Sequence, residues 1–136
     1  MKNPVFLVLF FLLVAGLGGC EGGKPEYPER QPPQGLLNDP EQIQQGRQLF
    51  MAKCADCHGK PDEGRSQRAD SFQPPAADFT EAEYRRAEPA YLFWRIAAGK
   101  TVEPYRSQGS VMPAWGPHFS DREIWQLIAY LQERGS

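Results

Sequence analysis

The chain has 136 residues, of which 15 are basic and 17 acidic, and 40% are hydrophobic. This length suits one small domain and excludes a second full-sized core. The net charge of −2 argues against a nucleic-acid-binding protein, which usually carries a basic excess. Thirteen Gly and 13 Pro predict extensive loops, but without the G-X-Y period of collagen. The three cysteines leave one unpaired if an exported chain forms disulfides, so the role of each cysteine has to be found separately.

Residues 1–19 have the pattern of an export signal. Lys2 is the only charged residue among them, an unbroken apolar run of 11 residues extends from Val5 to Ala15, and small residues follow. The run is shorter than the roughly 20 apolar residues that a membrane-spanning helix needs. We therefore expect a signal peptide that is removed rather than a permanent span.

The sequence Leu17-Gly18-Gly19-Cys20 resembles a bacterial lipobox. This resemblance implies cleavage before Cys20 and lipidation of its thiol. The lipid would anchor the protein to a membrane, with the protein facing the periplasm. Two or more acyl chains hold a protein stably, whereas one holds it marginally. Glu21, rather than Asp, follows the cysteine; in Gram-negative lipoproteins this favours the outer membrane. An ordinary signal peptide with a chance cysteine is the alternative.

Residues 20–37 read as the lipidated cysteine followed by a tether. The stretch is rich in Gly and Pro and has no apolar periodicity, which favours extended, unpaired backbone. At about 3.1 Å per residue it would reach roughly 50 Å. It either lets an anchored domain search for partners or simply clears the lipid headgroups.

The folded domain is expected at residues 38–136. Asp39 is a good helix N-cap and Pro40 a good first helical residue, so a helix should begin there. It leads into Cys54-Ala-Asp-Cys57-His58. In a helical turn the two thiols share a face and His58 lies one turn after Cys54. The C-x-x-C-H motif is the signature of covalent c-type haem attachment, with His58 as an iron ligand.

A redox pair, a zinc site and a disulfide fit this motif less well. A thioredoxin-like redox pair requires a βαβ pattern, which the chain lacks. A structural zinc site needs four ligands, and only His118 and Cys20 would remain to complete it. A disulfide between Cys54 and Cys57 would leave His58 without a role.

From Asp39 onward the chain resembles a class I, mitochondrial-type bacterial monohaem cytochrome c. The resemblance covers about 95 residues and includes Gly46 and Phe50, the haem motif, Met112-Pro113-Ala114-Trp115, and a final helix with Tyr130. It implies an all-α fold of three to four helices around one covalently bound haem c. It also implies that the helix containing Gly46 crosses the last helix closely, with Trp125 or Tyr130 as the aromatic residue at the crossing.

The resemblance assigns the sixth position on the iron to Met112, which lies 54 residues after His58. A thioether is a soft ligand that raises the reduction potential relative to harder ligands. Val111 and Trp115 would shield the haem from water. Met51 precedes the motif on the wrong side, and His118 is the competing ligand, which we expect at the surface.

Two further helices are predicted. One begins at Pro89 and ends at Gly99 as a left-handed cap, with bulky residues that pack partly on the haem and partly on other helices. Another begins with the capping box Ser120 to Glu123 and continues as an amphipathic stripe.

Residues 60–87 carry less information. In the resembled family a backbone carbonyl, often of a proline, accepts a hydrogen bond from the iron-bound histidine. Residues 65–68, where such a proline often falls, have none. Pro74 and Pro75 are the candidates.

These expectations describe an electron-transfer protein rather than an enzyme, which exchanges single electrons with redox partners in transient encounters. It would take no small-molecule substrate and bind no nucleic acid. The acidic net charge favours partners with a basic docking surface. Two alternatives stay open: an electron-transfer subunit of one membrane oxidoreductase, and a haem-based sensor or peroxidase-like protein in which Met112 is displaced.

Overall fold

The computed structural model describes residues 25–135, so the expected signal peptide and Cys20 lie outside the described part. The helical segments are η1 (Leu36–Asn38), α2 (Pro40–Lys53), α3 (Ala55–His58), η2 (Gln67–Ser71), α4 (Ala82–Arg85), α5 (Pro89–Ala98) and α6 (Asp121–Arg134). Residues 25–135 contain no strand, which confirms the predicted all-α fold. The three long helices are α2, α5 and α6, and α3 and α4 are single turns.

Both predicted N-caps are confirmed. The Asp39 carboxylate accepts a hydrogen bond of 2.9 Å from the backbone amide of Glu41, and Pro40 is the first residue of α2. At the start of α6, the Ser120 hydroxyl accepts from the backbone amide of Glu123, whose carboxylate accepts in return from the Ser120 amide at 2.7 Å. These bonds satisfy amides that have no partner inside the helix.

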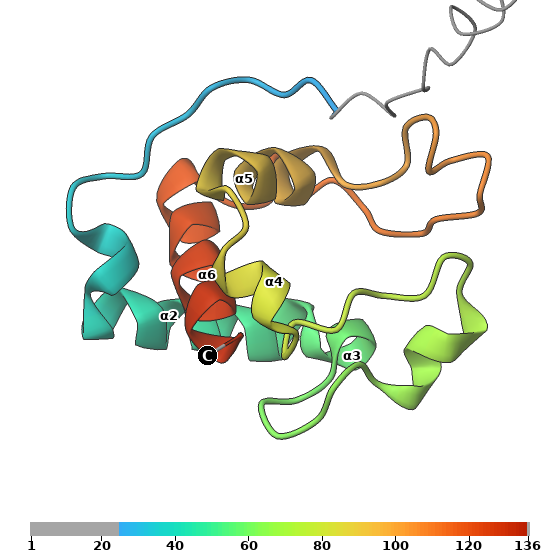
Figure 1. The fold of residues 1–136 in the computed structure, drawn as a ribbon, viewed down its shortest axis with the longest axis horizontal. Coiled ribbons are helices and arrows are strands. Elements are labelled where there is room, and N and C mark those ends of the chain that lie inside the picture. Colours follow the sequence, from blue (N-terminus) through green and yellow to red (C-terminus); the bar gives the residue numbers. More distant parts are fainter. Residues whose placement is uncertain (1–24, 136) are drawn as a thin grey trace, which may run out of the picture.

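Helices α2 and α6 cross at very short range. A Cβ atom placed on Gly46 would lie 1.9 Å from the backbone oxygen of Gln126, so only glycine fits at this crossing. Close by, the rings of Phe50 and Tyr130 pack with centroids 5.2 Å apart. The close crossing expected at Gly46 is therefore present, and Tyr130 is the aromatic residue that meets Phe50. Figure 1 shows α6 passing between α2 and α5.

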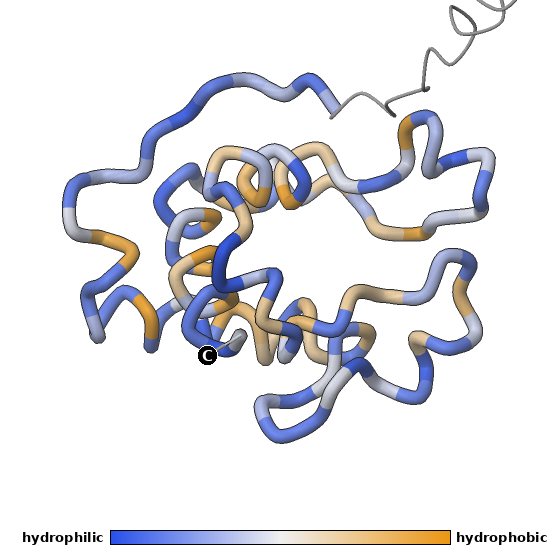
Figure 2. Tube along the Cα trace, in the orientation of Figure 1, coloured by the Kyte–Doolittle hydropathy of each residue, from blue (hydrophilic) through white to orange (hydrophobic). Residues whose placement is uncertain are grey.

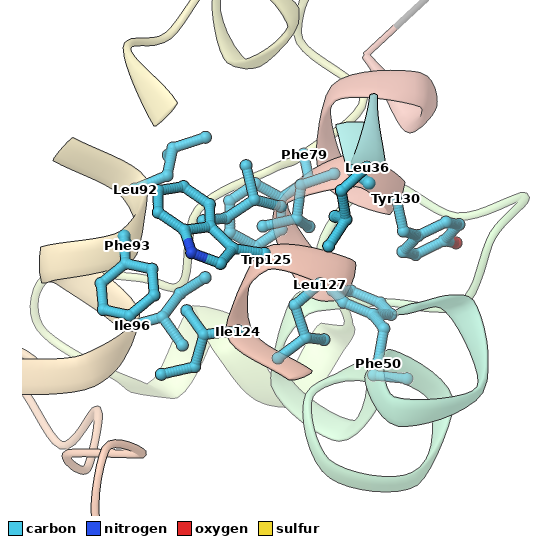
Figure 3. Packing of buried hydrophobic residues seen from close by; sticks show 14 residues of the cluster. Leu36, Phe50, Phe79, Leu92, Phe93, Ile96, Ile124, Trp125, Leu127 and Tyr130 are labelled. Carbon is cyan, nitrogen blue, oxygen red and sulfur yellow. The ribbon is translucent and has the colours of Figure 1, made fainter. Parts of the chain in front are cut away.

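Helix α5 packs on α6 through aromatic and aliphatic side chains (Figure 3). The ring of Phe93 lies 4.6 Å from that of Trp125, centroid to centroid. Ile96 and Ile124 belong to the same buried cluster, and Ile124 is 1% exposed. The bulky run in α5 divides as predicted, because Phe93 packs on α6 whereas Leu92 lines a cavity.

The segment before α2 arches past α5 and α6 (Figure 1), and its side chains contact both helices. Tyr27 stacks on Trp94 at 6.0 Å and meets Tyr91 edge-on at 5.5 Å. Arg30 forms a salt bridge of 2.7 Å with Asp121. Leu36 is 4% exposed and belongs to the core, so the folded unit includes residues before the expected start at 38.

Figure 2 shows that this N-terminal segment and the loop after α3 are largely hydrophilic, whereas the apolar residues gather where the long helices meet. Among residues 25–135, no helix has both the length and the apolar character needed to cross a membrane.

Candidate functional site

A cavity of about 180 Å³ lies between α3, α5, α6 and the loops that precede α4 and α6. Cys54, Cys57, His58 and Met112 all line it. The fold therefore brings the C-x-x-C-H motif together with a methionine 54 residues further along the chain. Apolar side chains such as Leu127 form much of the remaining wall.

The motif continues the helical path of α2. The amide of Cys54 donates to the carbonyl of Phe50 at 2.8 Å, and the amide of His58 donates to the carbonyl of Cys54 at 2.9 Å. Cys54 and Cys57 are free thiols and form no disulfide with each other. Burial, and to a lesser degree the neighbouring Cys57, raises the pKa of Cys54 to about 12. The Cys54 thiol is thus protonated at neutral pH, and both cysteines line the cavity.

The ring of His58 is held by a backbone carbonyl. Its Nδ1 lies 3.0 Å from the carbonyl oxygen of Ala77. Because a carbonyl only accepts, Nδ1 carries the proton and Nε2 keeps its lone pair for a metal. The expectation that Pro74 or Pro75 supplies this acceptor is wrong: both prolines line the cavity, and the acceptor is the carbonyl of Ala77, two residues after Pro75.

The imidazole of His58 is buried beside two aromatic rings. Phe79 lies 4.6 Å from the imidazole and Phe50 6.4 Å, centroid to centroid. Burial lowers the pKa of His58; the bond to Ala77 opposes this shift, and the charges of Lys100 and Arg134 add to it. The neutral imidazole that results is the form that binds metals.

The loop that carries Met112 is pinned to the end of α5. The amides of Trp115 and Gly116 donate to the carbonyls of Ile96 and Ala97 at 3.1 and 3.0 Å, and the amide of Lys100 donates to the Met112 carbonyl at 3.0 Å. The two helix carbonyls belong to the last turn of α5, where carbonyls have no donor inside the helix.

Gly99 allows this contact. A Cβ atom there would lie 2.5 Å from the carbonyl of Pro113. Its φ of 66° is positive as expected, but its ψ of −164° lies outside the left-handed helical region. The expected left-handed cap is therefore wrong in detail, because the backbone extends at once to meet the Met112 loop.

Arg95 is a site residue that no sequence motif singles out. It is 5% exposed, lines the cavity and stacks on Trp94, with Cζ 3.8 Å from the ring centroid. Nη2 donates to the Tyr105 hydroxyl at 3.4 Å. Among residues 25–135, Nε and Nη1 have no hydrogen-bond partner although both are buried. A buried guanidinium with unused donors beside a cavity is suited to an anionic group of a ligand.

Of the four remaining candidate residues, two line the cavity and two do not. Val111 and Trp115 line the cavity as expected. His118 is exposed on the loop before α6, 6.1 Å from the Trp115 ring, and does not line the cavity. Met51 is 40% exposed and is also absent from the cavity wall.

The charge at the cavity is opposite to the net charge of the chain. The Lys, Arg, Asp and Glu side chains that line it are Lys53, Arg95 and Lys100, all basic. The partner preference inferred from the acidic net charge therefore does not carry over to this face.

Comparison with known proteins agrees with this geometry. A family model described as "Cytochrome C oxidase, cbb3-type, subunit III" matches residues 41–131, which include the whole cavity. The chain belongs to this family. It is therefore a c-type cytochrome domain, and membership in the cbb3-type subunit III family implies a haem c cofactor and a role in electron transfer.

The chain is also similar to the Cbb3-type cytochrome c oxidase subunit FixP of Rhizobium meliloti (strain 1021), with 29% identity over 98 residues. The similar region is 72% of this chain but only 29% of that protein.

Within residues 25–135 there is no cluster of three or more His, Cys, Asp or Glu side chains that could hold a separate metal ion.

Proposed function

We propose that this protein is a class I-type, lipid-anchored cytochrome that carries single electrons between redox partners through one His/Met-ligated haem c. The observation that carries the proposal is the convergence of Cys54, Cys57, His58 and Met112 on one largely apolar cavity.

The four residues have distinct roles in this proposal. Cys54 and Cys57 would hold the haem through two thioether bonds, each formed by addition of a thiol S–H across one vinyl group. His58 binds the iron through Nε2, since Nδ1 is engaged with Ala77. Met112 supplies a thioether sulfur from the loop that is pinned to α5.

Arg95 supports the fit of a haem at this site. A haem carries two propionate groups, and the unpartnered Nε and Nη1 of Arg95 offer two donors to one of them. The Tyr105 hydroxyl and the Trp94 ring hold the guanidinium in place. The charged edge of the cofactor would thus lie at the basic side of an otherwise apolar cavity.

Electron transfer follows from the ligand set. When bound, the haem supplies an iron that alternates between the ferric and ferrous states by gain or loss of one electron. With His58 and Met112 both ligated, no position remains for a substrate, which favours a carrier over an enzyme. Phe50, Phe79 and Leu127 line the cavity and would shield a bound haem from water, which would favour the less charged ferrous state.

Intact-protein mass spectrometry and a potentiometric titration test this assignment. Under denaturing conditions the wild-type protein should keep the mass of one haem, and replacing both Cys54 and Cys57 by Ala should abolish that retention. The wild-type protein should titrate reversibly with one electron. A protein that loses its haem on denaturation, or that transfers two electrons, would refute the proposal.

The membrane attachment rests on Cys20 and the segment after it. We propose that residues 1–19 are removed, that Cys20 is lipidated and faces the periplasm, and that the outer membrane holds the anchor if the cell is Gram-negative. Because Tyr27 packs on α5, only residues 21–26 separate the anchor from the folded unit. At about 3.1 Å per residue, six residues of extended chain reach at most roughly 19 Å, well short of a tether through residue 37.

Replacing Cys20 by Ser tests this attachment. The variant should leave the membrane fraction, whereas the wild-type protein should remain there after a high-salt wash. Equal membrane retention of the two proteins would argue against lipidation.

A second candidate function is supported by the family match. The chain would then serve as an electron-entry subunit bound to one terminal oxidase rather than as a free carrier. Purification from membranes in mild detergent distinguishes the two, since a subunit co-purifies in fixed ratio with an oxidase and a free carrier does not.

A further inference from the structure

The last charged side chain of α6 reaches into the loop that follows the haem motif. Arg134 Nη1 lies 3.0 Å from the carbonyl oxygen of Gly59. Its Nη2 lies within 2.7–3.3 Å of four more carbonyl oxygens, those of His58, Lys60, Glu63 and Gly64. One guanidinium therefore meets five backbone carbonyls of a seven-residue stretch.

This stretch is folded tightly enough to form a cage. Gly59 has a φ of +78°, and a Cβ atom on it would lie 1.9 Å from the carbonyl oxygen of Gly64. The loop is closed further by the amide of Glu63, which donates to the Lys60 carbonyl at 3.0 Å. Its carbonyls point inward at one spot, where they need a donor with several N–H groups. An arginine supplies these in a planar fork, and a lysine does not.

The same guanidinium also lies close to two residues of the cavity wall, Phe50 and His58. Its Cζ is 4.9 Å from the centroid of the Phe50 ring, which packs against the imidazole of His58. The bond to the His58 carbonyl fixes the backbone of this residue, while Ala77 fixes its ring. Arg134 does not line the cavity, so its guanidinium contacts the His58 backbone from outside the cavity wall.

We infer that Arg134 is a positioning residue for the proposed haem site. It holds the loop after His58, and its fixed positive charge favours the ferrous state of the iron. The electrostatic effect arises because a nearby positive charge stabilises the state with one more electron. It is weakly screened, since Arg134 Nε is buried and has no partner among residues 25–135.

This inference rests on the proposed haem ligation, and its test separates the two. The variants are Arg134→Gln, which loses the charge, and Arg134→Lys, which keeps the charge but loses the fork. Lys60→Gln is the matched control, because it removes one charge from the same loop at an exposed position. For each haem-loaded protein, the midpoint potential and the thermal unfolding temperature are measured.

We expect Arg134→Gln to lower the unfolding temperature. It should also lower the midpoint potential, so that the ratio of reduced to oxidised protein at a fixed applied potential falls severalfold. Arg134→Lys should lose stability but keep nearly the wild-type potential, and Lys60→Gln should change neither. If the potentials of both Arg134 variants fall in step with their stability, or if Arg134→Gln keeps the wild-type potential, the electrostatic role is wrong. A wild-type protein without a covalently bound, His-ligated haem would instead refute the proposed function itself.

Discussion

Replacing Gly46 by Ala should destabilise the protein strongly although alanine is the better helix former. The new methyl group would begin 1.9 Å from the backbone oxygen of Gln126, whereas real Cβ contacts essentially never fall below 3.0 Å. Since the obstacle is backbone, no side chain can rotate away. Helices α2 and α6 must therefore separate by about 1 Å at their crossing.

The magnitude follows from two opposing terms. Overpacking of a well-packed interface costs about 1–3 kcal/mol, and the backbone contact places Gly46→Ala at the upper end. Helix propensity returns at most about 1 kcal/mol. The net loss of about 2 kcal/mol corresponds to a fall of roughly 10 °C in melting temperature for a domain of this size. The packing of Phe50 on Tyr130 would loosen as the helices separate.

Thermal and urea unfolding of the haem-loaded protein, followed by far-ultraviolet circular dichroism, measure this effect. The control is Gln48→Ala, at an exposed position on the same helix, which should stay within about 0.5 kcal/mol of wild type. If Gly46→Ala proved as stable as the control, the helices would not cross as closely as described.

Three further predictions concern other parts of the molecule. Tyr27→Ala should leave the core intact but release the N-terminal segment, so limited proteolysis should cleave before residue 35 much faster than in wild type; an unchanged cleavage rate would contradict the docking on Trp94. The pKa of Glu123 is lowered by its hydrogen bonds to the backbone and hydroxyl of Ser120. The ionised carboxylate therefore stabilises the fold above its usual pKa of 4.5, and this stabilisation is lost as the pH falls through the lower pKa of the folded state. Glu123→Gln should flatten that part of the pH–stability curve measured by urea unfolding, and an unaltered acid slope would show that the capping box contributes nothing there. Arg95→Leu should move the pH dependence of the midpoint potential to higher pH, because a propionate without the neighbouring guanidinium has a higher pKa. Arg95→Lys should restore most of the wild-type profile. Identical profiles for all three proteins would refute the contact between Arg95 and a haem propionate.

Features written in local sequence were predictable. Asp39 and the Ser120–Glu123 box mark helix starts because their side chains accept hydrogen bonds from amides two or three positions away, and Pro40 suits the first helical position. The C-x-x-C-H spacing is equally local. The close helix crossing at Gly46 was predictable from the resemblance of the chain to a known family, and not from the residues that neighbour Gly46 in the sequence.

Features that depend on distant backbone were not predictable. The Ala77 carbonyl that accepts from His58 has no side-chain signature, since every residue carries the same group. Arg134 meets carbonyls 70–76 positions away. The Pro-rich composition before α2 indicates extended backbone, but it does not reveal that Tyr27 packs on Trp94.

The exposure of the ferrous protein to carbon monoxide, followed by absorption spectroscopy, tests the central claim most directly. If His58 and Met112 occupy both axial positions, the wild-type spectrum should not change. Met112→Ala should bind carbon monoxide, whereas Met51→Ala, which alters an exposed methionine outside the cavity, should behave as wild type. Ready binding of carbon monoxide by the wild-type protein would contradict the assignment of a closed, His/Met-ligated electron carrier.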